Sequence, residues 1–243
     1  MAKLSIIIPA YNEERTISQV LDKIKQISLL DDTTKEIIIV NDASVDQTDS
    51  MVKRFIELNP TVAINYHLQP RNMGKGSALH KGIEIATGDY LIIQDADLEY
   101  DPAEYNLLLR PLLDGMADVV FGSRFMGGNP HRILFFWHSI GNKILTFISN
   151  VFSNLNLTDM ETCYKCFRSE FIKKIHLKET RFGFEPEVTA KIARFKNIRI
   201  YEVGISYYGR TYAEGKKINW KDGVRAIYCM VKYRFFDREY LKK

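Results

Sequence analysis

Short apolar runs alternate with segments of helical periodicity in the first half of the chain. The runs LSIIIPA, EIIIV, AINYHL, DYLII and ADVVF have the length of strands and are almost continuously apolar. Residues 14–30 repeat apolar side chains every three or four positions, which predicts an amphipathic helix. Further helices are predicted around 46–58 and after the glycine-containing turn in 71–86. Strands that are apolar throughout indicate a mostly parallel sheet covered on both faces, so the pattern predicts an α/β fold.

Polar residues follow four of these predicted strands at the point where each strand ends. They form the clusters Tyr11–Glu13, Asn41–Ser44, Asp95–Glu99 and Ser123–Arg124. The carboxyl ends of parallel strands gather along one edge of a sheet, and ligands bind there. We therefore expect the four clusters to share one cleft.

The segment QDADLEYDP, residues 94–102, concentrates carboxylates at one strand end. Asp95, Asp97 and Glu99 occupy alternate positions, where like charges repel one another. Such hard oxygen ligands suit Mg²⁺ or Mn²⁺, most often in a site that substrate phosphates complete. A D-x-D sequence alone is common, so a metal site and a solvated acidic loop are both open from this pattern.

Two further features bear on nucleotide binding. Asp42 follows another strand end and is a candidate for contact with a base or ribose, while Gly74–Gly76 allows close backbone approach around the cation of Lys75. The chain has no Walker A sequence and no G-x-G-x-x-G opening its first unit. These absences argue against a P-loop NTPase and against a hydride-transfer enzyme.

Two segments of the second half repeat apolar residues at helical spacing, 133–157 and 220–236. Packing against the core is the default explanation for such stripes. The second segment interleaves Arg225, Lys232 and Arg234 with its aromatic residues, which also suits a membrane interface. Polar residues interrupt the first segment, so neither qualifies as a transmembrane helix.

Charge and cysteine content narrow the class of protein. The net charge of +4 does not by itself indicate a nucleic-acid binder, but ten Lys/Arg against four Asp/Glu lie between Arg210 and Lys243. Three cysteines and no secretory signal favour a reducing compartment. Cys163 and Cys166 form a C-x-x-C without a second pair at zinc spacing, which argues against a structural zinc site.

Taken in order, the motifs resemble those of the family 2 glycosyltransferases with the GT-A fold. The matching stretches are SIIIPAYNEE, VNDASVDQT, NMGKGSAL, GDYLIIQDADLEYDP and FGSR. Within that family, the chain is most similar to the polyprenyl-phosphate sugar transferases, the dolichol-phosphate mannose synthase group. The resemblance implies one GT-A domain over 1–243. Its nucleotide-sugar-binding half would be 1–125, its acceptor half 126–220 and its basic amphipathic C-terminal helix 221–243.

The resemblance also implies a donor site and a metal site. The metal, Mg²⁺ or Mn²⁺, would be held by Asp95, Asp97 and Glu99, although Gln is frequent in the family where Glu99 stands. A loop at 207–217 would close over the donor. The residues implied in nucleotide-sugar binding are Pro9, Ala10, Tyr11, Glu13, Asp42, Gly74, Lys75, Asp95, Arg210 and Lys216.

Catalytic roles carry over to Asp97, Arg124, Asp159 and Lys165, and acceptor-phosphate contacts to Arg124, Arg132 and Lys165. Arg is common in the family at the position of Lys165, which offers a point charge in place of a bidentate fork. A lipid phosphate is already ionised and needs no general base. A sugar hydroxyl acceptor would need one, with Asp159 or Glu161 as the candidate.

The implied activity is inverting, metal-dependent transfer of a hexose from a nucleotide sugar of the GDP-mannose or UDP-glucose type to a polyprenyl phosphate. The expected partners are the donor, the lipid acceptor and either a membrane surface or a separate membrane subunit. A homo-oligomer is possible, no nucleic acid is expected, and the location would be the cytoplasmic face of a membrane. The alternatives are transfer to a glycan or polysaccharide hydroxyl and a non-catalytic nucleotide-sugar-binding protein.

Overall fold

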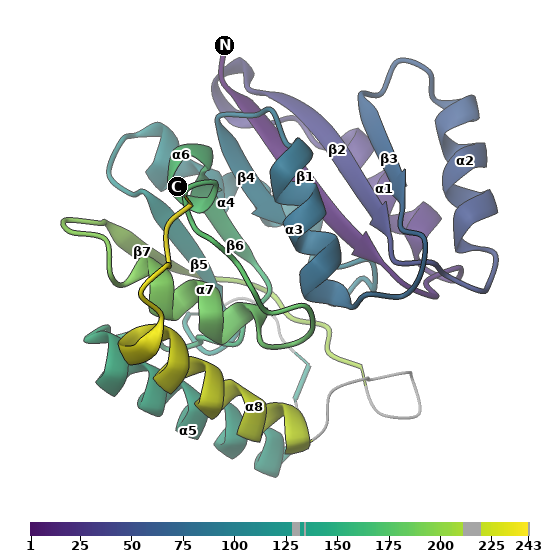
Figure 1. Ribbon diagram of the computed structural model, residues 1–243. Coiled ribbons are helices and arrows are strands. Elements are labelled where there is room, and N and C mark those ends of the chain that lie inside the picture. The colour runs from purple at the N-terminus through teal and green to yellow at the C-terminus, as the bar shows by residue number, and fades with distance from the viewer. Residues whose placement is uncertain (128–131, 134, 211–219, 243) are drawn as a thin grey trace.

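A seven-stranded sheet in the order β3-β2-β1-β4-β6-β5-β7 forms the centre of the computed structural model (Figure 1). The structure describes residues 1–127, 132–133, 135–210 and 220–242. The strands are β1 (Lys3–Ala10), β2 (Thr34–Asn41), β3 (Ile64–Leu68), β4 (Tyr90–Ile93), β5 (Val119–Ser123), β6 (Lys165–Arg168) and β7 (Ile200–Gly204). The longer helices are α1 (Ile17–Gln26), α2 (Thr48–Leu58), α3 (Lys75–Ile85), α4 (Tyr105–Leu113), α5 (Phe136–Ser153), α7 (Phe184–Ile192) and α8 (Trp220–Val231).

The sheet is parallel except around β6. Strand β1 pairs in parallel with β2 and β4, and β5 pairs in parallel with β7, whereas β6 runs antiparallel to both β4 and β5. The predicted mostly parallel α/β fold is therefore confirmed. The antiparallel strand was not predicted, because KCFR is only four residues long and has a charge at each end.

Helices cover both faces of the sheet, as the continuous apolar strands require. Successive side chains of a strand point to opposite faces. Ile6 and Ile8 pack in one core cluster with residues of α1, α2 and α4, whereas Ile7 packs in a second cluster with residues of α3 and α7. In Figure 1, α3 crosses the face turned towards the viewer and α1 lies behind the sheet.

Helices α5 and α8 lie side by side in a separate layer beyond α7, at the bottom of Figure 1. Helix α5 packs Leu145, Ile148 and Phe152 against the core, but its other side is also apolar and faces outward. Helix α8 continues into a π-helical turn, η4 (Lys232–Phe236). The helix expected over 221–243 therefore ends at Phe236.

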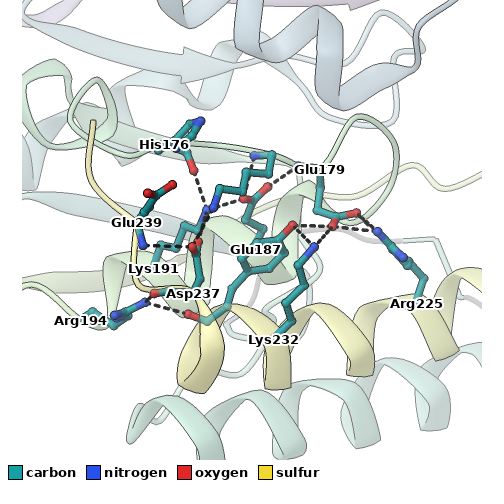
Figure 2. A network of polar contacts seen from close by, with 11 residues as sticks. His176, Glu179, Glu187, Lys191, Arg194, Arg225, Lys232, Asp237 and Glu239 are labelled. Atoms are coloured by element: carbon teal, nitrogen blue, oxygen red, sulfur yellow. Dashed lines mark hydrogen bonds and ion pairs between the residues drawn. The ribbon is translucent and has the colours of Figure 1, made fainter. Parts of the chain in front are cut away.

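A buried charge network fixes the end of the chain to α7 (Figure 2). Lys191 and Glu187 are fully buried, and the Lys191 Nζ lies 2.5 Å from a Glu187 carboxylate oxygen and 3.0 Å from Asp237 Oδ2. The other Glu187 oxygen accepts a hydrogen bond from the backbone N–H of Glu179. The Glu179 carboxylate in turn accepts hydrogen bonds from Arg225 of α8 at 2.8 Å and from a tyrosine of η4. The network thus links α7, the segment before it, α8 and the C-terminal residues.

Replacing Lys191 with methionine is expected to lower the free energy of unfolding by about 3–5 kcal/mol, because two buried carboxylates lose their cation. Burial alone would raise the pKa of Asp237, but hydrogen bonds from Lys178 and Lys191 hold that pKa at about 2. This stabilisation is complete above the unfolded pKa of about 3.9 and is lost as the pH falls towards 2. The loss of unfolding free energy between about pH 4 and pH 2 should therefore be smaller in the variant. Urea denaturation at several pH values would measure it. Lys196→Met, an exposed change near the same helix end, is the control, and a loss equal to that of the control would contradict the prediction.

Candidate active site

A cavity of about 450 Å³ opens along the carboxyl edge of β1, β2 and β4. Each of the four polar clusters predicted to share a cleft contributes at least one residue to its wall. The predicted donor-binding residues in the wall are Pro9, Ala10, Tyr11, Glu13, Asp42, Gly74, Lys75, Asp95 and Arg210. Lys216 lies outside the described residues.

Asp42 shapes the turn that presents Lys75 to the cavity. Its carboxylate accepts hydrogen bonds from the backbone N–H groups of Met73 at 2.7 Å and Gly74 at 2.8 Å. Gly74 has a φ of +96°, and a Cβ on Gly76 would lie 2.2 Å from the carbonyl oxygen of Glu179. The two glycines are therefore needed for backbone conformation and for close packing.

Lys75 points from this turn towards carboxylates. Its Nζ lies 2.8 Å from Asp95 Oδ1 and 3.7 Å from Glu185 Oε1. Burial alone would lower the pKa of Lys75, but Asp95, Cys163 and Glu185 raise it well above its usual value. Lys75 is therefore a fixed cation in the cavity wall.

Arg210 supplies most of the remaining positive charge around the acidic segment. Its Nη2 lies 2.5 Å from Asp97 Oδ2, its Nε 3.1 Å from Glu99 Oε1 and its Nη1 3.8 Å from Glu13 Oε2. Tyr207 donates a further hydrogen bond to Glu99 at 2.7 Å. The acidic segment is thus held between two cations, Lys75 on one side and Arg210 on the other.

The carboxylates at this edge suit a divalent metal bound together with an anionic ligand. Burial, and then the charges of Asp95 and Glu99, raise the pKa of Asp97 to about 7, so a cation bound beside Asp97 would favour its ionised form. Among the described residues, no three His, Cys, Asp or Glu side chains converge closely enough to bind a metal by themselves. Mg²⁺ and Mn²⁺ commonly bind through one or two carboxylates plus substrate phosphates, and the arrangement fits that mode.

Arg124 and Asp159 form a bidentate ion pair beside the cavity. Arg124 Nε and Nη2 lie 2.6 and 2.7 Å from the two carboxylate oxygens, and the backbone N–H of Arg124 donates to the same group. Arg124 lines the cavity, whereas Asp159 is fully buried behind it. The predicted location of Asp159 near the reaction centre is therefore indirect, because the carboxylate reaches the cavity only through Arg124.

Two residues assigned to acceptor phosphate from the sequence lie away from the cavity wall. Lys165 is fully buried in β6, where its Nζ donates to the carbonyl oxygens of Met160 and Thr162. Burial lowers the pKa of Lys165, and the ring of Phe121 lies 5.0 Å from its Nζ. Arg132 Nη1 donates to the carbonyl oxygen of Gly209. Direct phosphate contact by Lys165 disagrees with this placement, because the strand turns the side chain into the interior.

The wall of the cavity on the side of α7 includes Glu161, which the sequence analysis considered only as a base for a hydroxyl acceptor, together with Cys163 and Glu185, to which it assigned no role in the site. Cys163 Sγ lies 2.9 Å from Lys75 Nζ and 3.6 Å from Glu185 Oε1. Cys166 instead packs in the core, so the C-x-x-C sequence does not form a pair. Glu161 and Cys163 belong to the segment DMETCYK, and Glu185 belongs to GFEPE. No hydrophobic periodicity in the sequence predicts that these two segments meet at one cleft.

Most of the chain is similar in sequence to glycosyltransferases. The sequence model of the family described as Glycosyl transferase family 2 matches residues 5–176. The dolichyl-phosphate beta-glucosyltransferase ALG5A of Trichomonas vaginalis is 28% identical over 97% of this chain and 74% of its own length. The low-salt glycan biosynthesis hexosyltransferase Agl6 of Haloferax volcanii is 29% identical over 94% of this chain and 53% of its own.

Solved structures show the same fold. The crystal structure of glucosyl-3-phosphoglycerate synthase from Mycobacterium tuberculosis, in complex with Mn²⁺, UDP and phosphoglyceric acid, superposes with a TM-score of 0.72. It is 18% identical in sequence, and the superposition covers 98% of this chain and 80% of that one. At this level of identity the similarity establishes a common architecture.

Proposed function

The chain belongs to glycosyl transferase family 2, and from that premise we propose that it transfers a hexose from a nucleotide sugar to a polyprenyl phosphate at a membrane surface. The enzyme is a glycosyltransferase with the GT-A fold. In this proposal, residues 1–125 bind the nucleotide of the donor and 126–220 form the acceptor side and add Arg210 to the donor site, while α8 contributes to the membrane face. The reaction would take place at the cytoplasmic side.

One observation carries the choice of acceptor: the cavity extends from the donor residues to α5 and α8. At that end its wall is formed by His138, Asn142 and Leu145 of α5 and by Gly223 and Ala226 of α8. A Cβ on Gly223 would meet no atom of the described residues within 4 Å. An acceptor that reaches the acidic segment from this end passes along these residues of α5 and α8.

The outward side of these helices, which we term the α5–α8 face, is strongly apolar. Trp137, Ile144 and Val151 follow one another at seven-residue spacing with exposed fractions of 78%, 52% and 61%. The remaining large exposed apolar residues of the face are Phe136, Phe147, Val224, Ile227, Tyr228, Phe235 and Phe236. Soluble proteins rarely expose so continuous an apolar surface without a partner.

The partner that this face fits is an anionic bilayer surface. Lys143 and Lys221 are exposed on the same two helices, and amphipathic helices that combine basic and aromatic residues lie in the plane of a membrane interface. None of the described helices is long and apolar enough to cross a membrane. Binding on this face would bring the α5–α8 end of the cavity to lipid headgroups.

The described residues support the chemistry of such a transfer. Lys75 and Arg210 can donate to the diphosphate of the donor, and Arg124 can hold an anionic acceptor facing it. Mg²⁺ or Mn²⁺, held by one or two of the carboxylates Asp95, Asp97 and Glu99 together with the donor phosphates, would supply charge stabilisation for the leaving diphosphate. An ionised lipid phosphate is already a nucleophile, so the fully buried Asp159 is not required as a base.

The names of the relatives support both parts of the proposal. ALG5A is named for a dolichyl-phosphate acceptor, and the glucosyl-3-phosphoglycerate synthase was crystallised with UDP and Mn²⁺. The same synthase also raises a second candidate, transfer to a hydroxyl. Glu161 favours that candidate, because burial and the charge of Glu185 raise its pKa to about 8, within the range of a general base.

Transfer from UDP-glucose or GDP-mannose in the presence of Mg²⁺ or Mn²⁺ is expected only when vesicles contain a polyprenyl phosphate. The measurement is radiolabelled sugar in the lipid fraction, compared with vesicles without the lipid phosphate. Transfer of equal rate to a soluble saccharide without lipid would overturn the acceptor assignment and favour the hydroxyl candidate.

The double substitution Trp137→Ser and Phe147→Ser is expected to weaken binding to anionic vesicles by about 10-fold or more. Each large apolar side chain contributes about 1.5–3 kcal/mol when fully buried, and part of that is lost. Co-sedimentation with phosphatidylglycerol vesicles would measure the change. Leu58→Ser is the matched control, because Leu58 is 69% exposed on α2, away from the α5–α8 face. Equal binding by the double variant and the control would remove the membrane assignment.

A further inference from the structure

The cavity wall beyond the acidic segment contains a pair of carboxyl groups, Glu161 and Glu185. Glu161 belongs to the loop before β6, and Glu185 lies in the first turn of α7. Both residues line the same cavity. Neither residue belongs to the acidic segment or to the Arg124–Asp159 pair.

Glu161 differs from the other carboxyl groups of the site in its hydrogen bonding. Its Oε1 is buried and makes no hydrogen bond to any described residue. By contrast, Asp95, Asp97 and Asp159 each contact a lysine or arginine. Native proteins rarely leave a buried polar atom unsatisfied, so such an atom in a cavity wall indicates the position of a missing ligand group.

We propose that Glu161 and Glu185 bind the hydroxyl groups of the transferred hexose. This inference rests on the proposed function and specifies the donor more closely. In a nucleotide sugar, the base and ribose are followed by the diphosphate and then by the hexose. With the nucleotide at the ends of β1 and β2 and the diphosphate between Lys75 and Arg210, the hexose occupies the next part of the cavity, against these two carboxyl groups.

The charges around Glu161 suit sugar hydroxyls. Burial and then Glu185 of α7 raise the pKa of Glu161 to about 8, while Lys165 of β6 and Arg124 after β5 act to lower it and Asp159 acts to raise it. At neutral pH, Glu161 can therefore donate one hydrogen bond and accept another, while Glu185 accepts. Two such groups favour a neutral hexose and disfavour a hexuronate, whose carboxylate would meet a second negative charge.

The test compares Glu161→Met with Glu161→Gln. Methionine keeps the bulk but removes the hydrogen bonds, whereas glutamine keeps a neutral donor and acceptor. Glu161→Met is expected to weaken binding of UDP-glucose and GDP-mannose by about 10- to 100-fold and to leave UDP and GDP binding unchanged. Glu161→Gln is expected to stay within about 10-fold of the parent protein in donor affinity and in turnover.

Calorimetry with the full chain and Mn²⁺ gives these affinities, and Glu170→Met, at an exposed position of the short helix α6 (Ser169–Ile172), is the control. Glu185→Gln is the second variant. It is expected to weaken binding of UDP-glucose and GDP-mannose and to leave binding of UDP and GDP unchanged. The unmodified protein is expected to bind UDP-glucuronate about 10-fold more weakly than UDP-glucose.

Three results would overturn the inference. Unchanged donor affinity in Glu161→Met would show that Glu161 does not contact the sugar. Loss of turnover in Glu161→Gln with unchanged donor affinity would instead identify a general base. Equal binding of UDP-glucuronate and UDP-glucose would remove the selectivity. Failure of the acceptor assignment is distinguishable, because it abolishes lipid dependence while the differences in donor affinity persist.

Discussion

Asp97→Asn is expected to reduce metal-dependent turnover by roughly a thousandfold or more, with the fold intact. Asp97 is the central carboxylate of the acidic segment, and a neutral amide cannot offset the charge of a divalent cation. All three carboxylates already contact a cation, Asp95 through Lys75 and both Asp97 and Glu99 through Arg210, so the two neighbours have no unpaired charge with which to compensate for the loss of Asp97. Initial rates over a range of Mn²⁺ concentrations would measure the loss.

The stability of this variant separates catalysis from folding. Because burial and neighbouring charges raise the pKa of Asp97 to about 7, folding disfavours its ionised form. In the metal-free protein, ionisation of Asp97 therefore lowers the free energy of unfolding as the pH rises from about 4 to 7. The asparagine side chain does not ionise, so the variant does not lose stability in this way. We therefore expect its melting temperature with a chelator at pH 8 to equal or exceed that of the parent protein. Asp114→Asn, at an exposed position after α4, is the control, and near-normal turnover in Asp97→Asn would refute the metal assignment.

The second large effect is expected at the Arg124–Asp159 pair. Arg124→Lys keeps the charge but loses the fork that grips both oxygens of Asp159, and Asp159→Asn removes the charge that orients Arg124. Each change is expected to lower kcat/KM by about 100-fold. Because Asp159 is fully buried and acts through Arg124, the double variant should be no worse than either single variant.

The control for this cycle is a second arginine–aspartate pair of the same geometry. Arg199 Nη2 and Nε contact the two oxygens of Asp118 at 2.6 and 3.1 Å, and neither residue lines the cavity. Arg199→Lys and Asp118→Asn should change stability and leave kcat/KM within a few-fold. If the effects of Arg124→Lys and Asp159→Asn multiply, Asp159 acts independently, as a base for a hydroxyl acceptor would.

Local pattern was sufficient for the part of the fold that binds the donor. The strands β1 to β5 and the helices α1 to α3 lie where the apolar runs and helical periods predict them, whereas α4 between β4 and β5 was not predicted. The predicted cleft at the strand ends is present for the same reason, since parallel strands necessarily bring their carboxyl ends to one edge. The resemblance to family 2 glycosyltransferases rests on these same segments, and it is confirmed.

The acceptor side was less predictable because its features depend on contacts between distant segments. Strand β6 is too short to show an apolar period, yet it decides that Lys165 points into the interior. Helix α5 buries Thr146, Ser149 and Ser153 and exposes large apolar side chains, so its hydrophobic pattern alone could not show which side packs against α7 and which side is exposed. That choice required the position of α8, which arrives from the end of the chain.

By itself the sequence determined the doubly covered sheet, the edge where the site lies and the chemical types gathered there. Only the tertiary structure decided which charges neutralise one another. Arg124 and Asp159 are 35 positions apart, and Arg210 and Asp97 are 113 positions apart. The physical reason is that hydrophobic periodicity follows from the local geometry of the backbone, whereas ion pairs and buried, unpaired carboxyl groups arise only when remote segments pack together.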